Sequence, residues 1–518
     1  MANKQLFTAS RGKLAPETDG WNEALAPAYL LSPEHTLAQY VATGCFSSTF
    51  YASAEAQLWK VLKLAYLAEP EFTAKTALYA RQEAFMKDAP ALLCAVLSIS
   101  APDLLKKIFP RVIDNGKMLR NFVQIVRSGA VGRKSLGTVP KTLVKRWFAD
   151  RDETAIFRAS VGQAPSLADV IKMVHPKPKE KAREALYGYL IGKEVDADAL
   201  PKVVKDFERW KIAKGSTLPD VPFEMLTALE LGRVEWTAIA RNASWQMTRM
   251  NLATFARHGV FETKGMAETI ASRLKDPKEI AKARVFPFQL LSAYRAANDG
   301  IPRIVVDALQ DAMELAIENV PKVKGGVAIC PDVSGSMSSA ATGHRKGATS
   351  KVRCIDVAAL TAAAFLRANK NAVVLPFEER VVKVSLNPRD SVMTNAQRLA
   401  AVGGGGTNCS APLARLNERK ADCEVVVLVS DMESWVDAKA GGRGTATMKE
   451  WEIYKQRIPN ARLVCIDIQP YRTTQAIERE DILNVGGFSD DVFKVVAEFT
   501  AGRLSAGHWV ERIERMEI

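Results

Sequence analysis

Hydrophobic residues recur with the spacing of amphipathic helices along most of the chain before residue 320. In "KMLRNFVQIVRSG" the apolar residues lie three or four positions apart and share one helix face: Leu119, Phe122, Val123 and Val126. Arg120 and Arg127 fall on the opposite face, which we expect to be solvated or to bind a ligand, and Gly129 is placed to end the helix. The segment "PALLCAVLSIS" is apolar on most sides, which is typical of a helix buried between neighbours.

Short helices of this kind follow one another from about residue 21 to residue 319, separated by segments such as "AEPEF", "SAPD" and "KDPKE". Proline, glycine and aspartate at these places end one helix and start the next. The pattern predicts stacked helical hairpins rather than a compact bundle.

The pattern changes after "VPKVKGG". Runs of strand length rich in valine and isoleucine follow: "GGVAICPDVS", "NAVVLPF", "VVKVSL", "CEVVVLVSD" and "ARLVCIDIQP". Helical stretches separate most of them, at residues 355–368, 395–402 and 445–458. The alternation predicts a doubly wound α/β domain with a mainly parallel sheet. We therefore expect a tail at residues 1–20, a helical domain at 21–321 and an α/β domain at 322–518.

Oxygen-bearing side chains gather where the predicted strands end. The motif "DVSGSM" follows one strand, "SDMES" follows another, and the glycine-rich loop "GGGGTN" precedes a helix. Ligands of open α/β sheets bind beyond the carboxyl ends of the strands, so we expect five residues to meet there: Asp332, Ser334, Ser336, Thr407 and Asp431. Carboxylates and hydroxyls without sulfur or imidazole suit a hard divalent cation, with Mg²⁺ the best match.

Two simpler interpretations apply to parts of this motif. Taken alone, "DVSGSM" is also a turn that closes a strand. The glycines at 403–406 could cradle a phosphate, but "G-x-x-x-x-G-K-[ST]" is absent, and close approach of the backbone to the metal rim explains them. Water or a carboxylate from a partner would complete the coordination of the ion.

Charge adds a second candidate surface. The chain has a formal net charge of +13, and residues 101–149 hold 11 basic residues against two acidic ones, which favours a polyanionic partner. In "PKTLVKRWF", Lys141 and Lys145 share one helix face, and the apolar side chains share another. A basic helix of this kind is also common as a merely solvated face.

Other features exclude several classes of protein. The seven cysteines contain no C-x-x-C pair, the N-terminus lacks the apolar core of a signal peptide, and no apolar run has the length of a membrane span. We expect a cytoplasmic protein without a membrane partner. The five histidines are scattered, so we expect no enzymatic activity.

The five oxygen ligands resemble the metal-ion-dependent adhesion site (MIDAS) of von Willebrand factor A domains. Several segments, in order along the chain, also resemble the Ro autoantigen family with its TROVE domain: "TLAQYVATGCFSSTFY", "VGRKSLGTVPKTLVKRWF", "LADVIKMVHPKP", "WTAIARNASWQM", "KARVFPFQLLSAY" and "VSDMESW". The resemblance covers residues 25 to 500 and suggests a bacterial or phage-borne Ro-like protein.

This resemblance implies a monomeric ring of HEAT-like helical repeats closed by the A domain. Family members bind misfolded or immature noncoding RNA, with a single-stranded 3′ end in the central hole and duplex on the outside. They also bind small Y RNAs, which gate access and tether an exoribonuclease. We therefore expect a ribonucleoprotein that acts in RNA quality control or maturation.

The resemblance and the local charge together give the candidate RNA-binding residues: Arg133, Lys134, Lys141, Lys145, Arg158, Lys172, His175 and Lys177. His175 could equally be structural, as a helix cap. Gly162 stands where the family pattern has a basic residue, which puts the set of Y RNA contacts in doubt. We expect Trp147, Trp236 and Trp245 in the core.

An alternative function belongs to a different class. The chain would then be a protein-interaction scaffold, in which the A domain holds an acidic partner through its metal and the helical array binds other proteins. A hydrolytic role for the metal is disfavoured because the motif lacks a general base and a second metal.

Overall fold

The computed structural model describes residues 13–43, 53–283, 287–297, 300–316, 320, 322–323, 325–341, 352–435, 444–487, 490–502 and 508–518. The chain forms two compact units. The α/β unit contains Met1–Leu64, Ile280–Ala296 and Leu309–Ile513, and the helical unit contains Ala65–Glu279, Ala297–Ala308 and Glu514–Ile518. Each unit is considered separately below.

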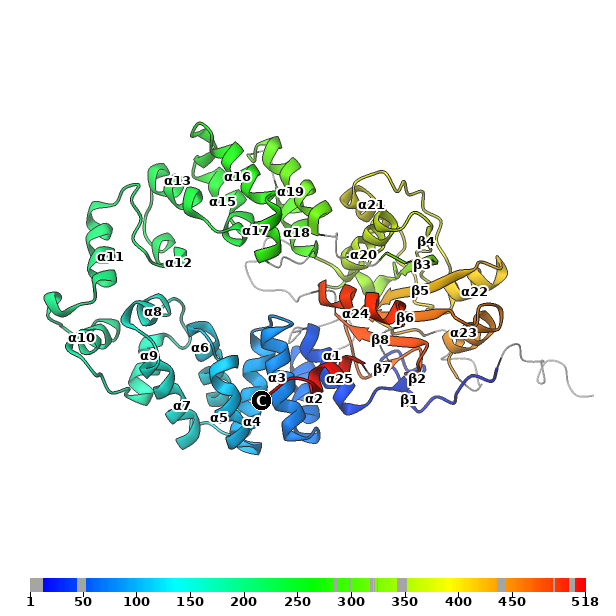
Figure 1. Cartoon of the computed structure of the whole chain (residues 1–518), viewed down its shortest axis with the longest axis horizontal. Coiled ribbons are helices and arrows are strands. Elements are labelled where there is room, and N and C mark those ends of the chain that lie inside the picture. The colour runs from blue at the N-terminus through cyan, green and yellow to red at the C-terminus, as the bar shows by residue number, and fades with distance from the viewer. Residues whose placement is uncertain are drawn as a thin grey trace, which may run out of the picture. The chain divides into compact units, whose positions relative to one another are not determined.

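The helical unit consists of short helices that pack on their neighbours along the chain (Figure 1). Its helices are α3 (Pro70–Gln82), α4 (Asp88–Ser100), α5 (Pro102–Val112), α6 (Gly116–Arg127), α7 (Thr138–Ala149), α8 (Glu153–Arg158), α9 (Leu167–Val174), α10 (Lys181–Leu190), α11 (Lys202–Ala213), α12 (Phe223–Thr227), α13 (Arg233–Asn242), α14 (Trp245–Met250), α15 (Leu252–Arg257) and α16 (Met266–Leu274). Four further helices lie at or near the borders of the units: α2 (Ala54–Leu67), α17 (Pro277–Ala283), α18 (Pro287–Ala296) and α19 (Arg303–Ala316). The predicted helical N-terminal region is confirmed.

Local sequence signals set the ends of these helices. Prolines occupy the first turn of α3 and α5, where the missing N–H has no helical partner to lose. Asn115 caps α6 by accepting a hydrogen bond from the Met118 amide at 3.1 Å. Ser166 and Asp169 form a reciprocal capping box at the start of α9. Pro and polar caps therefore explain why the helices are short.

The predicted apolar faces of α4 and α6 are confirmed. Most of α4 is buried, and the four predicted apolar residues of α6 are fully buried. The expectation for Arg120 was wrong, because its guanidinium donates to the carbonyl oxygen of Ala159 at 2.8 Å and is half-buried. That contact depends on a loop far along the chain, which helical spacing does not encode.

The α/β unit contains a five-stranded parallel sheet in the order β4-β3-β5-β6-β8. Its strands are β3 (Gly326–Pro331), β4 (Ala372–Val374), β5 (Cys423–Ser430), β6 (Arg462–Asp467) and β8 (Ile482–Gly486). The predicted parallel α/β fold is confirmed. The segment "VVKVSL" was wrongly predicted as a strand, since only Val381 forms an isolated bridge, to Phe377. The pattern analysis missed β8.

Helices cover both faces of this sheet (Figure 1). Those of this unit that follow β3 are α20 (Cys354–Ala368), α21 (Val392–Leu399), α22 (Ala411–Glu418), α23 (Ala446–Arg457) and α24 (Asp490–Thr500), of which α21 packs on α20. The last helix of the chain, α25 (His508–Glu514), lies beside α1 and α2 in Figure 1 rather than on the sheet. Alternate residues of each strand point to opposite faces. Ala328, Cys330 and Leu428 therefore join Leu413 of α22 and Trp451 of α23 in one apolar core. On the other face, α20 packs against β3, β4 and β5.

The first part of the chain also packs on the α/β unit. Strand β2 (Pro27–Leu30) pairs with β1 (Gly20–Trp21) and with β7 (Thr473–Thr474), and α1 (Pro33–Thr43) packs against β8. Buried His35 contacts the Glu478 carboxylate at 2.6 Å. The expectation of helix nearly throughout from residue 21 was wrong here, because β2 is stabilised by a partner strand more than four hundred residues away. The predicted boundaries at residues 20 and 322 are therefore not the limits of the compact units.

The cysteines and the apolar helices were also subjects of the sequence analysis. Six cysteines within the described residues are buried and free, and Cys45 lies outside those residues. No helix in the described part of the chain is both long and apolar enough to cross a membrane.

Candidate functional site

The five predicted metal ligands lie together where β3 and β5 end. Asp332 follows β3, and Asp431 follows β5, the neighbouring strand in the sheet. The connection after β3 leads to β4 on one side, and the connection after β5 leads to β6 on the other, so this is the point of an open sheet where ligands bind. All five side chains are at most 5% exposed. The structure thus brings residues of three separate segments together at one rim, and their role as metal ligands stays a prediction.

Hydrogen bonds join these oxygens into one network. The Ser334 amide donates to Asp332 Oδ1 at 2.8 Å, which fixes the turn after β3. The Thr407 hydroxyl donates to Ser334 Oγ at 2.9 Å, and Ser334 Oγ lies 3.2 Å from Ser336 Oγ. Three hydroxyls from two loops are thus held within hydrogen-bonding distance of one another.

The glycine-rich loop lies directly against the "DVS" turn. The Gly404 amide donates to the Val333 carbonyl at 2.9 Å, and the Gly335 amide donates to the Gly405 carbonyl at 2.8 Å. Gly403 has φ +90°, and a Cβ there would overlap the carbonyl oxygen of Val333. The glycines therefore allow the close backbone approach that brings Thr407 to the rim.

The electrostatics of the rim favour a cation. Burial, together with the neighbouring Asp431, raises the pKa of Asp332 to about 7, and burial also raises the pKa of Asp431. Oδ2 of Asp431 is buried and has no hydrogen-bond partner within the described residues. A divalent ion would supply the missing partner and offset the repulsion between the two carboxylates, so the residues present fit the predicted group.

Three more polar residues surround this rim and were not predicted. The Ser430 hydroxyl donates to Asp332 Oδ2. Glu433 and Asp467 are buried, and burial followed by the charge of Asp431 raises the pKa of each. Ser430 and Glu433 belong to the quoted "SDMES" motif, whereas Asp467 ends β6 and follows the same strand-end rule. No group of three His, Cys, Asp or Glu side chains suited to a metal occurs in the described ranges, so the hydroxyls are essential to any such site.

The predicted basic face lies on α7, in the helical unit. Leu143, Val144, Trp147 and Phe148 are buried as predicted. Lys141 and Lys145 are half-exposed, and α7 packs against α9, which carries exposed Lys172. Lysines from two packed helices therefore contribute to the same part of the helical unit.

Two predicted RNA contacts have structural partners instead. Arg133 donates at 3.3 Å to the carbonyl oxygens of Ser98 and Leu136, which fastens the segment before α7 to α4. Arg158 forms an ion pair with Asp220. Lys134 and Lys177 are exposed. The sequence did not indicate Ser98 and Asp220 as partners because they lie 35 and 62 residues away from Arg133 and Arg158.

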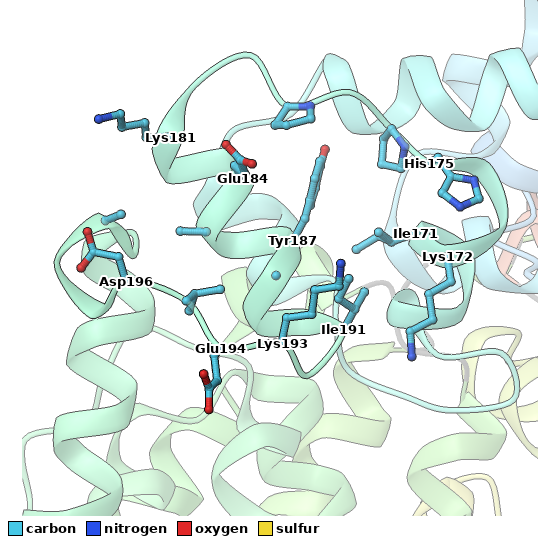
Figure 2. Close-up of a pocket in the computed structure, with 16 residues that line it drawn as sticks. Ile171, Lys172, His175, Lys181, Glu184, Tyr187, Ile191, Lys193, Glu194 and Asp196 are labelled. Carbon is cyan, nitrogen blue, oxygen red and sulfur yellow. The ribbon is translucent and has the colours of Figure 1, made fainter.

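A pocket of about 1000 Å³ opens beside α9 and α10 (Figure 2). Lys172 and His175 line it on the α9 side, and Tyr187 of α10 forms part of its wall. Lys181 and Lys193 also line it and were not predicted, since a pocket between two helices leaves no mark in the spacing of either one. Lys172, Lys181 and Lys193 are balanced by Glu184, Glu194 and Asp196, so the pocket is polar without a strong net charge.

His175 caps α9 in the left-handed conformation, with φ 51°, while its side chain is exposed to the pocket. The structure therefore shows His175 as a helix cap, and the RNA contact of its exposed ring stays a prediction. The three tryptophans are in the core as predicted: the indole N–H groups of Trp147 and Trp245 donate to the carbonyls of Ile113 and Leu274, and Trp236 is stacked on His258.

Comparisons with known proteins agree with this architecture. Residues 208–325 match the family described as TROVE domain, and residues 327–500 match the Ro60 vWA domain. The chain is 25% identical to "RNA-binding protein RO60" of Deinococcus radiodurans over 93% of its own length and 95% of that protein. A Caenorhabditis elegans protein of the same name is 22% identical over 51% of this chain and 41% of that protein.

A solved structure supports the fold. The chain is similar to the crystal structure of the Deinococcus radiodurans RO (RSR) protein, with a TM-score of 0.63 and 23% identity, over 91% of this chain and 100% of that one. The two domains occur in the predicted order along the sequence. From residue 208 to residue 500 the chain therefore matches a TROVE domain followed by a vWA domain of the Ro60 type.

Proposed function

We propose that this protein binds noncoding RNA through the lysines of α7 and α9 and acts in RNA quality control or maturation. The proposal is supported by Lys141, Lys145 and Lys172, which come from two packed helices and have no acidic ion-pair partner within the described residues. Exposed unpaired lysines attract phosphates without reading base sequence. The relatives named RNA-binding protein RO60 support the same function.

The finer proposal concerns the form of the RNA. Misfolded or immature RNA with a single-stranded 3′ end would pass through the predicted ring and keep its duplex outside, and a Y-like RNA would bind on the outer surface and tether an exoribonuclease. No catalytic step is proposed for the protein itself.

Filter binding of a structured RNA with and without a single-stranded 3′ tail, over a salt series, tests this proposal. We expect tail-dependent binding that weakens steeply with salt. Reversing Lys141 and Lys145 to Glu should lower the slope of log affinity against log salt by about 1 to 2 and weaken binding at least tenfold. Lys370→Glu/Arg389→Glu, a matched pair of exposed cations in the α/β unit, should leave binding nearly unchanged. If both double variants lost RNA affinity equally, the assignment of RNA binding to α7 would be refuted.

A second proposal concerns the rim of the sheet. We propose that Asp332, Ser334, Ser336, Thr407 and Asp431 hold Mg²⁺, which would present an open coordination position to a protein partner. Its support is the buried Asp431 Oδ2 without a hydrogen-bond partner in the described part of the chain. In the absence of RNA, the protein would serve the alternative function of an interaction scaffold through this rim.

Calorimetric titration with Mg²⁺ tests the second proposal. We expect wild-type protein to bind one ion and Asp431→Ala to lose this binding. Glu424→Ala, at an exposed carboxylate on β5, should bind Mg²⁺ as the wild type does. Loss of RNA affinity in folded Asp431→Ala would contradict the separation of the two functions.

A further inference from the structure

A basic groove of about 550 Å³ lies on the α/β unit beside the rim. One wall is the segment after β4, with Arg380 and Lys383, and the other is α22 and the residue after it, with Arg415 and Arg419. Four positions separate Arg415 from Arg419, so one side of α22 presents both. The proposed RNA surface and the metal ligands leave this groove without a role.

The groove is built to attract anions. Arg415 forms an ion pair with Glu418, but Arg380, Lys383 and Arg419 are exposed and have no ion-pair partner within the described residues. Glu379 and Glu418 are the acidic residues of the lining, against four basic ones. Three cations therefore remain for a ligand.

The groove and the metal rim share one hydrogen-bonded frame. The Asn408 amide donates to the Glu378 carbonyl at 3.0 Å, and its side-chain nitrogen donates to the Glu379 carbonyl at 3.1 Å. The Gly405 amide donates to the Glu378 carboxylate at 2.9 Å. Asn408 lines the groove and directly follows Thr407, so one short extended peptide is long enough to reach both places.

The lining also distinguishes between two anionic ligands. Small aliphatic residues, Val381, Ala411 and Ala414, lie among the cations, and no aromatic residue lines the groove. Unpaired bases bind by stacking on aromatic side chains, which are missing from this lining. Aliphatic stems of acidic side chains pack well on such residues while their carboxylates meet the arginines.

We propose that this groove binds an acidic segment of a protein partner, with Arg380, Lys383 and Arg419 contacting its carboxylates while a further carboxylate of the same segment reaches the metal rim. The contact at the metal rim rests on the proposed function, whereas the contacts in the groove do not.

Fluorescence anisotropy with a labelled peptide of alternating glutamate and alanine tests this inference on the full chain. In EDTA, Arg380→Glu/Lys383→Glu should weaken binding about tenfold, and Arg389→Glu/Lys370→Glu, outside the groove, should change it less than twofold. A peptide of alternating glutamine and alanine should not bind. Because a double reversal can perturb folding, Arg419→Gln provides a milder variant, with an expected loss of about threefold.

Adding Mg²⁺ distinguishes peptide binding at the groove from peptide binding at the metal rim. Tighter peptide binding in Mg²⁺ that disappears in Asp431→Ala supports both ends, and binding that ignores Mg²⁺ but needs the groove cations supports the groove while refuting the metal proposal. Groove variants that melt like the wild type and bind the peptide equally well would overturn the inference. So would an RNA oligonucleotide that binds more tightly than the peptide and depends on the same cations, because RNA would then be the occupant.

Discussion

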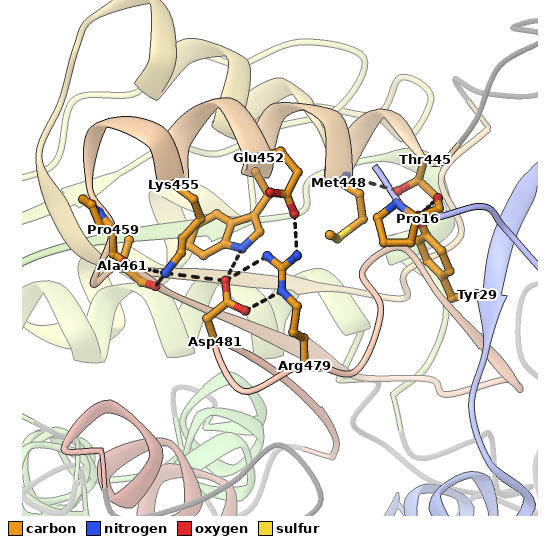
Figure 3. Close-up of polar contacts among 11 residues, drawn as sticks. Pro16, Tyr29, Thr445, Met448, Glu452, Lys455, Pro459, Ala461, Arg479 and Asp481 are labelled. Carbon is orange, nitrogen blue, oxygen red and sulfur yellow. Dashed lines mark hydrogen bonds and ion pairs between the residues drawn. The ribbon is translucent and has the colours of Figure 1, made fainter. Parts of the chain in front are cut away.

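Arg479 holds the buried carboxylate of Glu452 and the partly buried carboxylate of Asp481 together in the α/β unit (Figure 3). It bonds both carboxylate oxygens of Asp481, at 2.5 and 2.9 Å, and the Glu452 carboxylate at 2.5 Å. Asp481 also accepts from the Trp451 indole at 2.9 Å. The side chains of Glu452 and Asp481 are only 4% and 16% exposed, so neither is well solvated without Arg479.

Replacing Arg479 with Met removes the positive charge and keeps most of the side-chain volume. Breaking a buried ion pair by removing one partner costs about 3–5 kcal/mol, and the exposure of one third of the Arg479 side chain reduces this to about 3 kcal/mol. We expect a lower transition temperature of the α/β unit in scanning calorimetry. The exposed Arg472, mutated to Met, serves as the control and should lose less than about 0.5 kcal/mol.

A double-mutant cycle tests whether an unpaired carboxylate causes the loss of stability in Arg479→Met. Without Arg479, Asp481 keeps Lys455 at 3.6 Å and the Trp451 indole, whereas the buried Glu452 carboxylate loses its cation. Adding Glu452→Gln to Arg479→Met removes that unpaired charge, so the double variant should be more stable than the sum of the single losses predicts. A loss below about 1 kcal/mol in Arg479→Met, or strict additivity in the cycle, would refute this reasoning.

Three more results are expected. Burial raises the pKa of Asp481, but hydrogen bonds from Arg479 and Trp451 outweigh burial and hold this pKa below 3.8. The ionised carboxylate therefore stabilises the folded state at pH values above its unfolded pKa, and this stabilisation is lost as the pH falls. The difference in transition temperature between wild type and Arg479→Met should narrow below pH ~4. Trp147→Ala should lower the free energy of unfolding in urea by about 3–5 kcal/mol, because it opens a cavity and leaves the Ile113 carbonyl unpaired, and a loss under 1 kcal/mol would contradict a core role. Arg183 donates to the carbonyls of Phe148 and Arg151 and to Glu153, so Arg183→Met should lower the melting temperature of the helical unit well below that of the control Lys172→Met, and equal melting would contradict it.

The sequence predicted which residues meet at the rim of the sheet because the rule that places them is local. Asp332 and Asp431 each follow a strand, and the carboxyl ends of neighbouring parallel strands lie side by side whatever the rest of the chain does. The apolar faces of α6 and α7 were predicted for the same reason, since helical spacing alone decides which side chains share a face.

Features that depend on distant partners were not predicted. Arg133 and Arg158 looked like free cations, but Ser98 and Asp220 engage them. The pair β1 and β2 carried no alternation long enough to signal strands, and their pairing with β7 decides their conformation. The groove of Arg380 and Arg419 combines two segments that only the fold brings together.

The pairing of β2 with β7 affects how the protein is made. Tyr29 lies opposite Thr474, so this small sheet closes only after the ribosome has synthesised the chain as far as β7. Until then, β1, β2 and α1 lack the surface on which they pack, and the helical unit has time to form first. A gene fragment that starts at residue 322 would yield an A domain without β1, β2 and α1, with β8 and β7 left uncovered along one side and prone to aggregate.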